Sequence, residues 1–250
     1  MADPILQVDE VGPLDLGPGQ RAPKVVVPRR GFHHLTYILE GEMEVSDSRG
    51  HAALLRRGDV EVQALGTGLV ATESSSAQLH AIQLWVNQSV ADKATPPRTV
   101  DVRSSDLPIG FVSDGGISRG QVRLVAGEAA DLGLKSPVPF PAFLLHVSLQ
   151  PRGVFTYRLP SRATAVAYVL EGAGSFDDAK VARAGQLVWF DTAGDALRIE
   201  NPHQSINTLE CLLVGGAPLG DLVRQHGSLI AASDEGLIAA VNDLAAGRIV

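Results

Sequence analysis

Short apolar stretches separated by Gly-containing turns run along most of the chain. In the first half, Leu35–Leu39, Met43–Val45, Ala52–Leu55 and Val60–Gln63 have the length of strands, and Leu79–Val86 alternates between two faces. Several short strands at such spacing are typical of a β-sandwich or a β-barrel. The pattern therefore predicts an all-β fold.

The second half continues in the same way and ends with one helical pattern. An apolar stripe of Leu237, Ile238, Val241 and Leu244 follows Ser233, a residue suited to cap a helix. We expect this helix to pack on the body of the protein. The predicted strands of this half are Val122–Val125, Phe143–Leu149, Ala165–Leu170, Leu187–Phe190, Ala196–Glu200 and Leu209–Val214.

An internal repeat divides the chain in two. The segment Thr36–Glu42 recurs as Ala167–Ala173, with Tyr37 and Tyr168 separated by 131 positions, and a second Gly-containing match follows each copy at a spacing of 127. Two collinear matches at nearly one offset indicate a duplicated domain. We predict one barrel with its connection in residues 1–108 and a second barrel plus the terminal helix in residues 109–250, with 87–108 as the connection.

Composition and charge exclude several function classes. The formal net charge is −7, so an extended nucleic-acid surface is not expected. Cys211 is the only cysteine and lies in an apolar run, which predicts a small core residue rather than a nucleophile. No apolar run approaches the roughly 20 residues that a membrane helix needs, and no leader pattern follows Met1. We expect a cytoplasmic protein without membrane contact.

Longer motifs make the chain similar to one family. Besides Thr36–Gly41 and Gly58–Val60, the matches are Val8–Glu10, Gly17–Gly19, Arg30–Phe32, Gly66–Val70, Leu79–Asn87, Gly127–Ala129, Gly216–Leu219 and Gln225–Gly227. Taken in order, they resemble the pirin family of the cupin superfamily over nearly the whole chain. The resemblance implies two tandem cupin barrels. It also implies an N-terminal stretch of strand before Leu6–Glu10, so a barrel edge is expected to be missing, rebuilt or completed by a second subunit in a homodimer.

The resemblance also implies a metal site, which this sequence alters. Pirins place three His and one Glu around iron in the first barrel, and the matching positions here are Val27, Arg29, Ala71 and Glu73. Val and Ala have no donor atom, and Arg stays protonated and would repel a dication. We therefore expect no bound metal and no cofactor. Arg29 either points inward and contacts Glu73 or extends outward at the barrel mouth.

Other histidines offer weaker candidates for a pocket. His33 and His34 could form a shifted metal site with Glu73, but two or three ligands without a clear spacing are weak evidence for one. His80 alternates with Ile82 and Leu84, which places it either in the barrel interior or in its wall. We expect a hydrogen-bonded core histidine there rather than a catalytic one.

Three functions follow from the resemblance. The first is a metal-free binding protein, because pirins are associated with regulatory proteins such as transcription factors and metabolic enzymes. The second is a quercetin 2,3-dioxygenase that uses a shifted ligand set, since some pirins have this activity and need their metal for it. The third is a pseudoenzyme that keeps a pocket for a small organic ligand. The ligand positions favour a protein without enzymatic activity, whose partner or ligand the sequence does not name.

Overall fold

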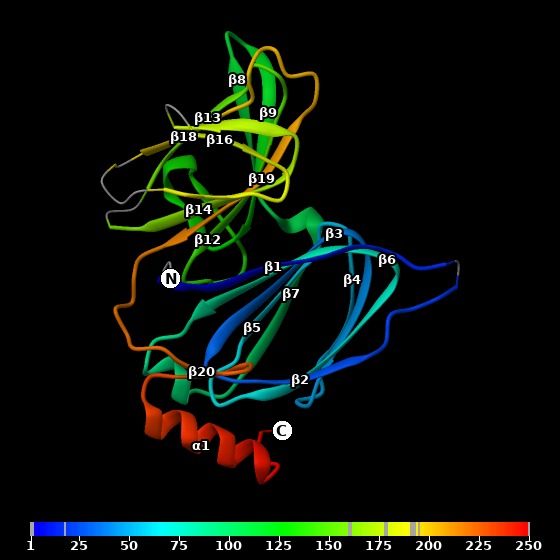
Figure 1. Ribbon diagram of the computed structural model, residues 1–250, viewed down its shortest axis with the longest axis vertical. Coiled ribbons are helices and arrows are strands. Elements are labelled where there is room, and N and C mark those ends of the chain that lie inside the picture. Colours follow the sequence, from blue (N-terminus) through cyan, green and yellow to red (C-terminus); the bar gives the residue numbers. More distant parts are fainter. Residues whose placement is uncertain are drawn as a thin grey trace. The chain divides into compact units, whose positions relative to one another are not determined.

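The computed structural model describes residues 3–17, 19–159, 162–177, 180–190, 194 and 196–249. Within them strands predominate, as expected for an all-β fold (Figure 1). The chain forms two compact units. The first barrel comprises Ile5–Ser105 together with Leu219–Val250, and the second barrel comprises Asp106–Pro218 together with the N-terminal residues up to Pro4. No helix in the described residues is both long and apolar enough to cross a membrane.

The first barrel is built around a seven-stranded antiparallel sheet. Its order is β1-β6-β3-β5-β7, with β2 added beside β6 and β4 beside β3. The longest strand pairing of this sheet joins β3 and β6, and bulges near Gly41 let both strands bend. The elements are β1 (Ile5–Asp15), β2 (Val25–Arg29), β3 (Phe32–Asp47), β4 (Ala52–Arg56), β5 (Val60–Ala64), β6 (Leu69–Asn87), η1 (Asp92–Ala94), β7 (Arg98–Val102) and η2 (Ser104–Asp106).

One segment expected to be a connection is a strand of this barrel. β7 lies within residues 87–108 and pairs with β5 along its whole length. The prediction failed because the Pro-bearing and polar flanks hid a short alternating stretch. Val100 and Val102 alternate there with Thr99 and Asp101. The correction matters for function because β7 carries Asp101 into the barrel.

The second barrel is built from two main sheets, and β10 and β11 form a short additional ribbon. A six-stranded sheet runs β17-β14-β19-β12-β9-β8, and a four-stranded sheet runs β13-β18-β15-β16. An apolar cluster that includes Leu145, Phe155 and Phe176 packs residues of both sheets together, and Cys211 is buried within it, as predicted. The elements are β8 (Ile109–Asp114), β9 (Ile117–Ala126), β10 (Glu128–Ala129), η3 (Ala130–Leu132), β11 (Leu134–Lys135), β12 (Phe143–Leu149), β13 (Val154–Arg158), β14 (Thr164–Glu171), β15 (Ala173–Phe176), β16 (Lys180–Arg183), β17 (Leu187–Trp189), β18 (Ala196–Glu200) and β19 (Leu209–Gly216).

The backbone register supports the predicted duplication. Tyr37 pairs with Val60, and Tyr168 pairs with Leu187, at the equivalent place of the second barrel. Gly41 and Gly172 have φ values of 80° and 79°. A Cβ at Gly41 would lie 1.8 Å from the carbonyl oxygen of Gln78, so only glycine fits the turn.

The C-terminal segment belongs to the first barrel, not to the second as predicted. β20 (Arg224–His226) and β21 (Leu229–Ala231) form a small ribbon, and Leu229 forms a bridge with Arg30. The helix α1 (Asp234–Ala245) begins as expected, because Gly236 donates to the hydroxyl of Ser233 at 3.1 Å.

The helix packs differently from the predicted stripe. Leu237 packs against a small cluster formed by Leu229, Ala240 and Ile249. Ile238 instead remains 62% exposed, and Val241 and Leu244 are exposed as well. Polar contacts also hold the helix, since Arg30 donates to Asp243 at 2.6 Å. The apolar stripe therefore contributes less to docking than the sequence suggests.

Candidate functional site in the first barrel

A polar layer crosses the interior of the first barrel between two apolar clusters. Along β3, alternate residues share one face, and Phe32 and Ile38 each belong to a different buried cluster. The two residues between them on this face, His34 and Thr36, are fully buried. Burying polar groups costs folding free energy unless they are paired. The contacts of these side chains therefore show which of them are satisfied within the barrel and which could bind a ligand.

The four positions that match the family's metal site lie together on β2 and β6. Val27 pairs with Ala71 in the antiparallel ladder, Arg29 pairs with Leu69, and Glu73 pairs with Val25. Ala71 is 2% exposed and belongs to the apolar cluster at one end of the barrel.

Arg29 points inward and contacts Glu73. Its Nη2 donates to Oε1 of Glu73 at 2.6 Å, and its Nη1 donates to the side-chain oxygen of Gln63 at 3.1 Å. The amide of Gln83 donates to the other carboxylate oxygen of Glu73 at 3.0 Å. The arginine and glutamate side chains are only 4% and 13% exposed. The inward pair is therefore present, and the interpretation that Arg29 extends outward is wrong.

These residues do not fit an iron ion held as the family resemblance implies. Val27 and Ala71 offer no ligand atom, and the guanidinium of Arg29 already balances the one carboxylate that remains. A dication beside Glu73 would have to displace a permanently charged group that has no free lone pair. The donor set is thus unsuited to an imidazole-dependent iron site.

His33, His34 and His80 do not form one pocket. His33 and His34 are neighbours on one strand and so project to opposite faces. His34 lies beside Trp85, with ring centroids 6.4 Å apart, and burial, followed by the nearby Arg29 charge, holds its pKa well below the usual value. Burial lowers the pKa of His33 to about 4, with Asp92 and Lys93 as the charged groups near it.

His80 lies on the face of β6 opposite Ala81 and Gln83. Its Nε2 is 2.6 Å from Oε1 of Glu10 on β1. It thus packs in the barrel wall, one of the two expected arrangements. Across the described residues, the shifted metal site of His33, His34 and Glu73 is not assembled, because the only group of three suitable side chains lies elsewhere.

Sequence reasoning missed several interior residues. Gln63 and Gln83 complete the surroundings of the Arg29–Glu73 pair, and Glu61, 1% exposed, lies one alternation before Gln63 on β5. A signal for Glu61 was available, since it stands between Val60 and Val62, two apolar residues of a predicted strand. A charged residue at such a position must be paired, protonated or bound to an ion.

A surface groove lies along the same barrel. It has a volume of about 420 Å³, and Lys24, Glu44 and Ser46 supply polar groups beside the apolar Ala53 and Leu54. This volume lies within the range of small-molecule sites, and mixed polar and apolar walls are usual for them.

Comparisons with known proteins agree with this architecture. The family model described as pirin matches residues 1–86, and the pirin C-terminal cupin domain matches residues 144–250. The chain belongs to the pirin family. A pirin-like protein of Arabidopsis thaliana is 31% identical over 226 residues, which cover 86% of this chain and 71% of that protein. Human pirin is 30% identical over 225 residues, which cover 86% of this chain and 74% of that protein.

A solved structure shows the same fold. Quercetin 2,3-dioxygenase from Acinetobacter baumannii superimposes with a TM-score of 0.89 at 24% identity, covering 99% of this chain and 86% of the other. At this identity the likeness speaks for the fold alone. The two-cupin architecture expected for a pirin is thereby confirmed.

Proposed function

We propose that this pirin-family protein acts by binding a regulatory partner or a small organic ligand rather than by iron-dependent oxygenation. The observation that carries the proposal is the Arg29–Glu73 pair. Its 2.6 Å contact fills the position where the resemblance implies iron. We therefore do not assign to this chain the quercetin 2,3-dioxygenase activity that the name of the structural neighbour states.

The physical argument rests on charge. A bound dication would balance Glu73 and leave Arg29 as a buried, uncompensated cation. The existing pair instead leaves both groups neutralised by one another, and Gln63 accepts from Arg29 while Gln83 donates to Glu73. Glu73 therefore needs no metal ion to balance its charge. The groove beside Glu44 and Leu54 supports a binding role, since it lies on the same barrel.

Rebuilding the family's ligand set tests the proposal. The wild-type protein, loaded with Fe²⁺ or Ni²⁺, should consume no oxygen with quercetin beyond a protein-free control. The variant Val27→His/Arg29→His/Ala71→His keeps Glu73 and should gain one tightly bound iron per chain. Circular dichroism before loading checks that the variant is folded.

A second variant makes the test specific. Glu73→Gln removes the remaining carboxylate of the family position. Any metal that the wild-type protein binds should be retained in this variant. Metal-dependent turnover of quercetin by the wild-type protein that disappears in Glu73→Gln would overturn the proposal and restore the dioxygenase function.

A further inference from the structure

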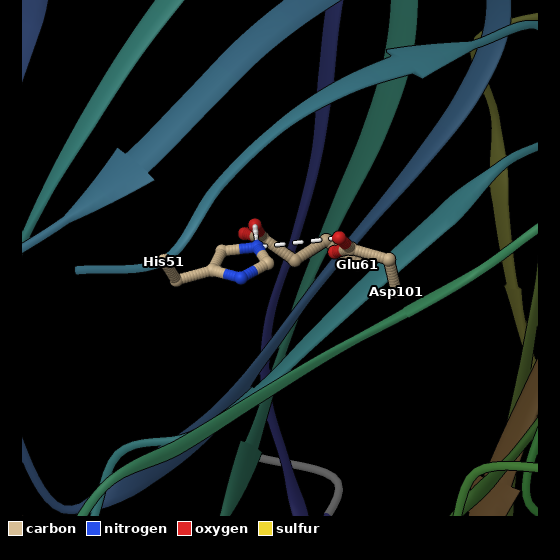
Figure 2. Close-up of side chains that lie close together, drawn as sticks. All are labelled: His51, Glu61 and Asp101. Atoms are coloured by element: carbon tan, nitrogen blue, oxygen red, sulfur yellow. Dashed lines mark ion pairs between the residues drawn. The ribbon is translucent and has the colours of Figure 1, made fainter. Parts of the chain in front are cut away.

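Three side chains from three different elements meet inside the first barrel, away from the Arg29–Glu73 pair. His51 ends the turn before β4, Glu61 lies on β5, and Asp101 lies on β7. Figure 2 shows the two carboxylates approaching the same ring nitrogen of His51. Nε2 of His51 lies 3.5 Å from Oε2 of Glu61 and 3.3 Å from Oδ2 of Asp101. One ligand atom from each residue lies within 4.8 Å of the others.

The group contains buried polar atoms that no hydrogen bond satisfies. Within the described part of the chain, neither carboxylate oxygen of Glu61 has a hydrogen-bond partner, and the same holds for Nε2 of His51 and Oδ1 of Asp101. Glu61 is 1% exposed, so bulk solvent does not reach its carboxylate. Unsatisfied buried polar groups destabilise the folded state, and charged ones do so most. Glu61 is thus a buried carboxylate without hydrogen-bond partners, and it lies close to two other side chains that can bind a metal ion. This arrangement indicates a missing ligand.

Charge around Glu61 points to a cation as that ligand. Burial, with the carboxylates of Asp101, Glu73 and Asp47, raises the pKa of Glu61 to about 8, and Arg29 only partly offsets them. Arg29 is engaged with Glu73, and the other basic groups that act on these carboxylates are His51 and, for Asp101, Arg103. With this pKa Glu61 is protonated at neutral pH, and a dication bound between these groups would displace that proton.

The separations from His51 fit metal coordination, and the one to Asp101 also fits a hydrogen bond. Neighbouring ligands of a tetrahedral ion with bonds of about 2.0–2.1 Å are separated by about 3.4 Å. The two separations from His51 Nε2, 3.3 and 3.5 Å, bracket this value. One imidazole with two carboxylates suits borderline divalent metals such as zinc, and it leaves a fourth position for water or a ligand.

The backbone around His51 is also held in place. Its own amide donates to Oδ1 of Asp47 at 3.1 Å, and Asp47 accepts from Thr99 through its other oxygen at 2.9 Å. Thr99 lies on β7, two residues before Asp101. The turn that carries His51 is therefore tied to the strand that carries Asp101. Such outer contacts orient the ligands of metal sites.

We propose that His51, Glu61 and Asp101 form a binding site for one divalent transition-metal ion of the zinc type. The site is distinct from the family position, because it uses none of Val27, Arg29, Ala71 and Glu73. His51 and Asp101, 24% and 20% exposed, give solvent access to one side of it. The inference does not depend on the proposed function, which concerns the Arg29–Glu73 position.

The experiment uses Zn²⁺ as the probe. Full-length protein treated with a chelator and dialysed is titrated with Zn²⁺ by calorimetry, and Co²⁺ is added in parallel to detect the visible bands of a tetrahedral ion. We expect one ion per chain. His51→Ala and Asp101→Asn should each weaken Zn²⁺ binding by at least about a hundredfold, more than loss of an outer contact would.

Two control variants distinguish Zn²⁺ binding at His51, Glu61 and Asp101 from binding at another histidine or at the family position. The first control, His146→Ala, removes a histidine of the second barrel that is about as exposed as His51 and lies 3.1 Å from the carboxylate of Glu210. This variant should bind Zn²⁺ as the wild-type protein does. Glu73→Gln removes a charge near Glu61 but no proposed ligand, so it should weaken Zn²⁺ binding far less than His51→Ala does. Absence of a Zn²⁺ site, retention of binding in both His51→Ala and Asp101→Asn, or loss in Glu73→Gln alone would each overturn the inference.

Discussion

The two barrels share a backbone pattern but differ in the chemistry of their interiors. In the first barrel, Thr36 pairs with Glu61 on one side and with Gln83 on the other. The equivalent ladder positions of the second barrel are Ala167, Val188 and Leu213. All six side chains lie inside their barrels at the same register, three of them polar and three apolar.

The turn that follows the repeated motif is conserved in detail between the barrels. Gly58 donates to the carbonyl of Ile38 at 2.7 Å, and Gly185 donates to the carbonyl of Val169 at 2.9 Å. The frame therefore depends on turn glycines and strand register, and it tolerates either kind of interior. The apolar interior of the second barrel shows that this frame does not need the polar layer of the first.

The largest expected effect comes from giving the second barrel a polar interior. Leu213→Gln would remove a buried apolar side chain and bury an amide in a cluster of apolar residues. We expect a loss on the order of 4 kcal/mol in the free energy of unfolding, from lost apolar burial and an unpaired amide together. Urea denaturation followed by tryptophan fluorescence measures it.

The reciprocal exchange serves as the control. Gln83→Leu in the first barrel removes one donor to Glu73 but adds apolar burial, so its cost should be smaller, about 1–2 kcal/mol. Equal costs for the two exchanges would mean that the interiors do not differ in their tolerance of polar groups.

The sequence predicts the frame that the two barrels share better than it predicts the polar interior of the first. The repeat around Tyr37 and Tyr168 predicts the shared frame, because turn glycines and alternating strands are local features. The Arg29–Glu73 contact was predictable only through the family's positions, since the residues are 44 apart in the chain. The group of His51, Glu61 and Asp101 was not foreseen. It depends on β7, whose short pattern is local but whose partner strand is fixed only by the folded sheet.

A second, smaller effect tests the ion pair that replaces the family's metal ligands. Arg29→Ala would leave Glu73 buried without its cation, and we expect a loss on the order of 3 kcal/mol. Replacing both residues with apolar ones of similar size, Arg29→Met/Glu73→Leu, should cost less than the single change. The unfolding free energies of the wild type, Arg29→Met, Glu73→Leu and the double variant form a double-mutant cycle that isolates the coupling of the pair.

The second barrel offers a matched pair for this measurement. Arg198 and Glu200 are also 2.6 Å apart, but they are 42% and 31% exposed. Arg198→Ala should therefore cost less than about 1 kcal/mol. Additive effects of the substitutions at Arg29 and Glu73 would show that burial adds nothing to the pair.

The smallest effect concerns the shared turn, where the two barrels use different acceptors. The carboxylate of Asp59 accepts from the amide of Arg56 at 3.1 Å, from the amide of Ser104 at 2.9 Å and from Arg103 at 2.7 Å. In the second barrel, the side-chain oxygen of Gln186 accepts from the amide of Arg183 at 2.9 Å. Hydrogen bonds to a charged group contribute more than neutral ones. We expect Asp59→Ala to cost about 2 kcal/mol and Gln186→Ala about 1 kcal/mol at pH 7.

The pH dependence of the two losses makes this last comparison decisive. Burial alone would raise the pKa of Asp59, but the hydrogen bonds from Ser104, Arg103 and Arg56 outweigh it and hold the pKa below its usual value. A carboxylate with a depressed folded-state pKa stabilises the fold above its unfolded-state pKa, and this contribution is lost as the pH falls through the folded-state value. The cost of Asp59→Ala should therefore shrink when unfolding is measured in steps from pH 7 to pH 3. The cost of Gln186→Ala should not follow that trend, because an amide does not titrate in this range. Parallel pH profiles for the two variants would show that the charge of Asp59 contributes nothing beyond the neutral acceptor of the second barrel.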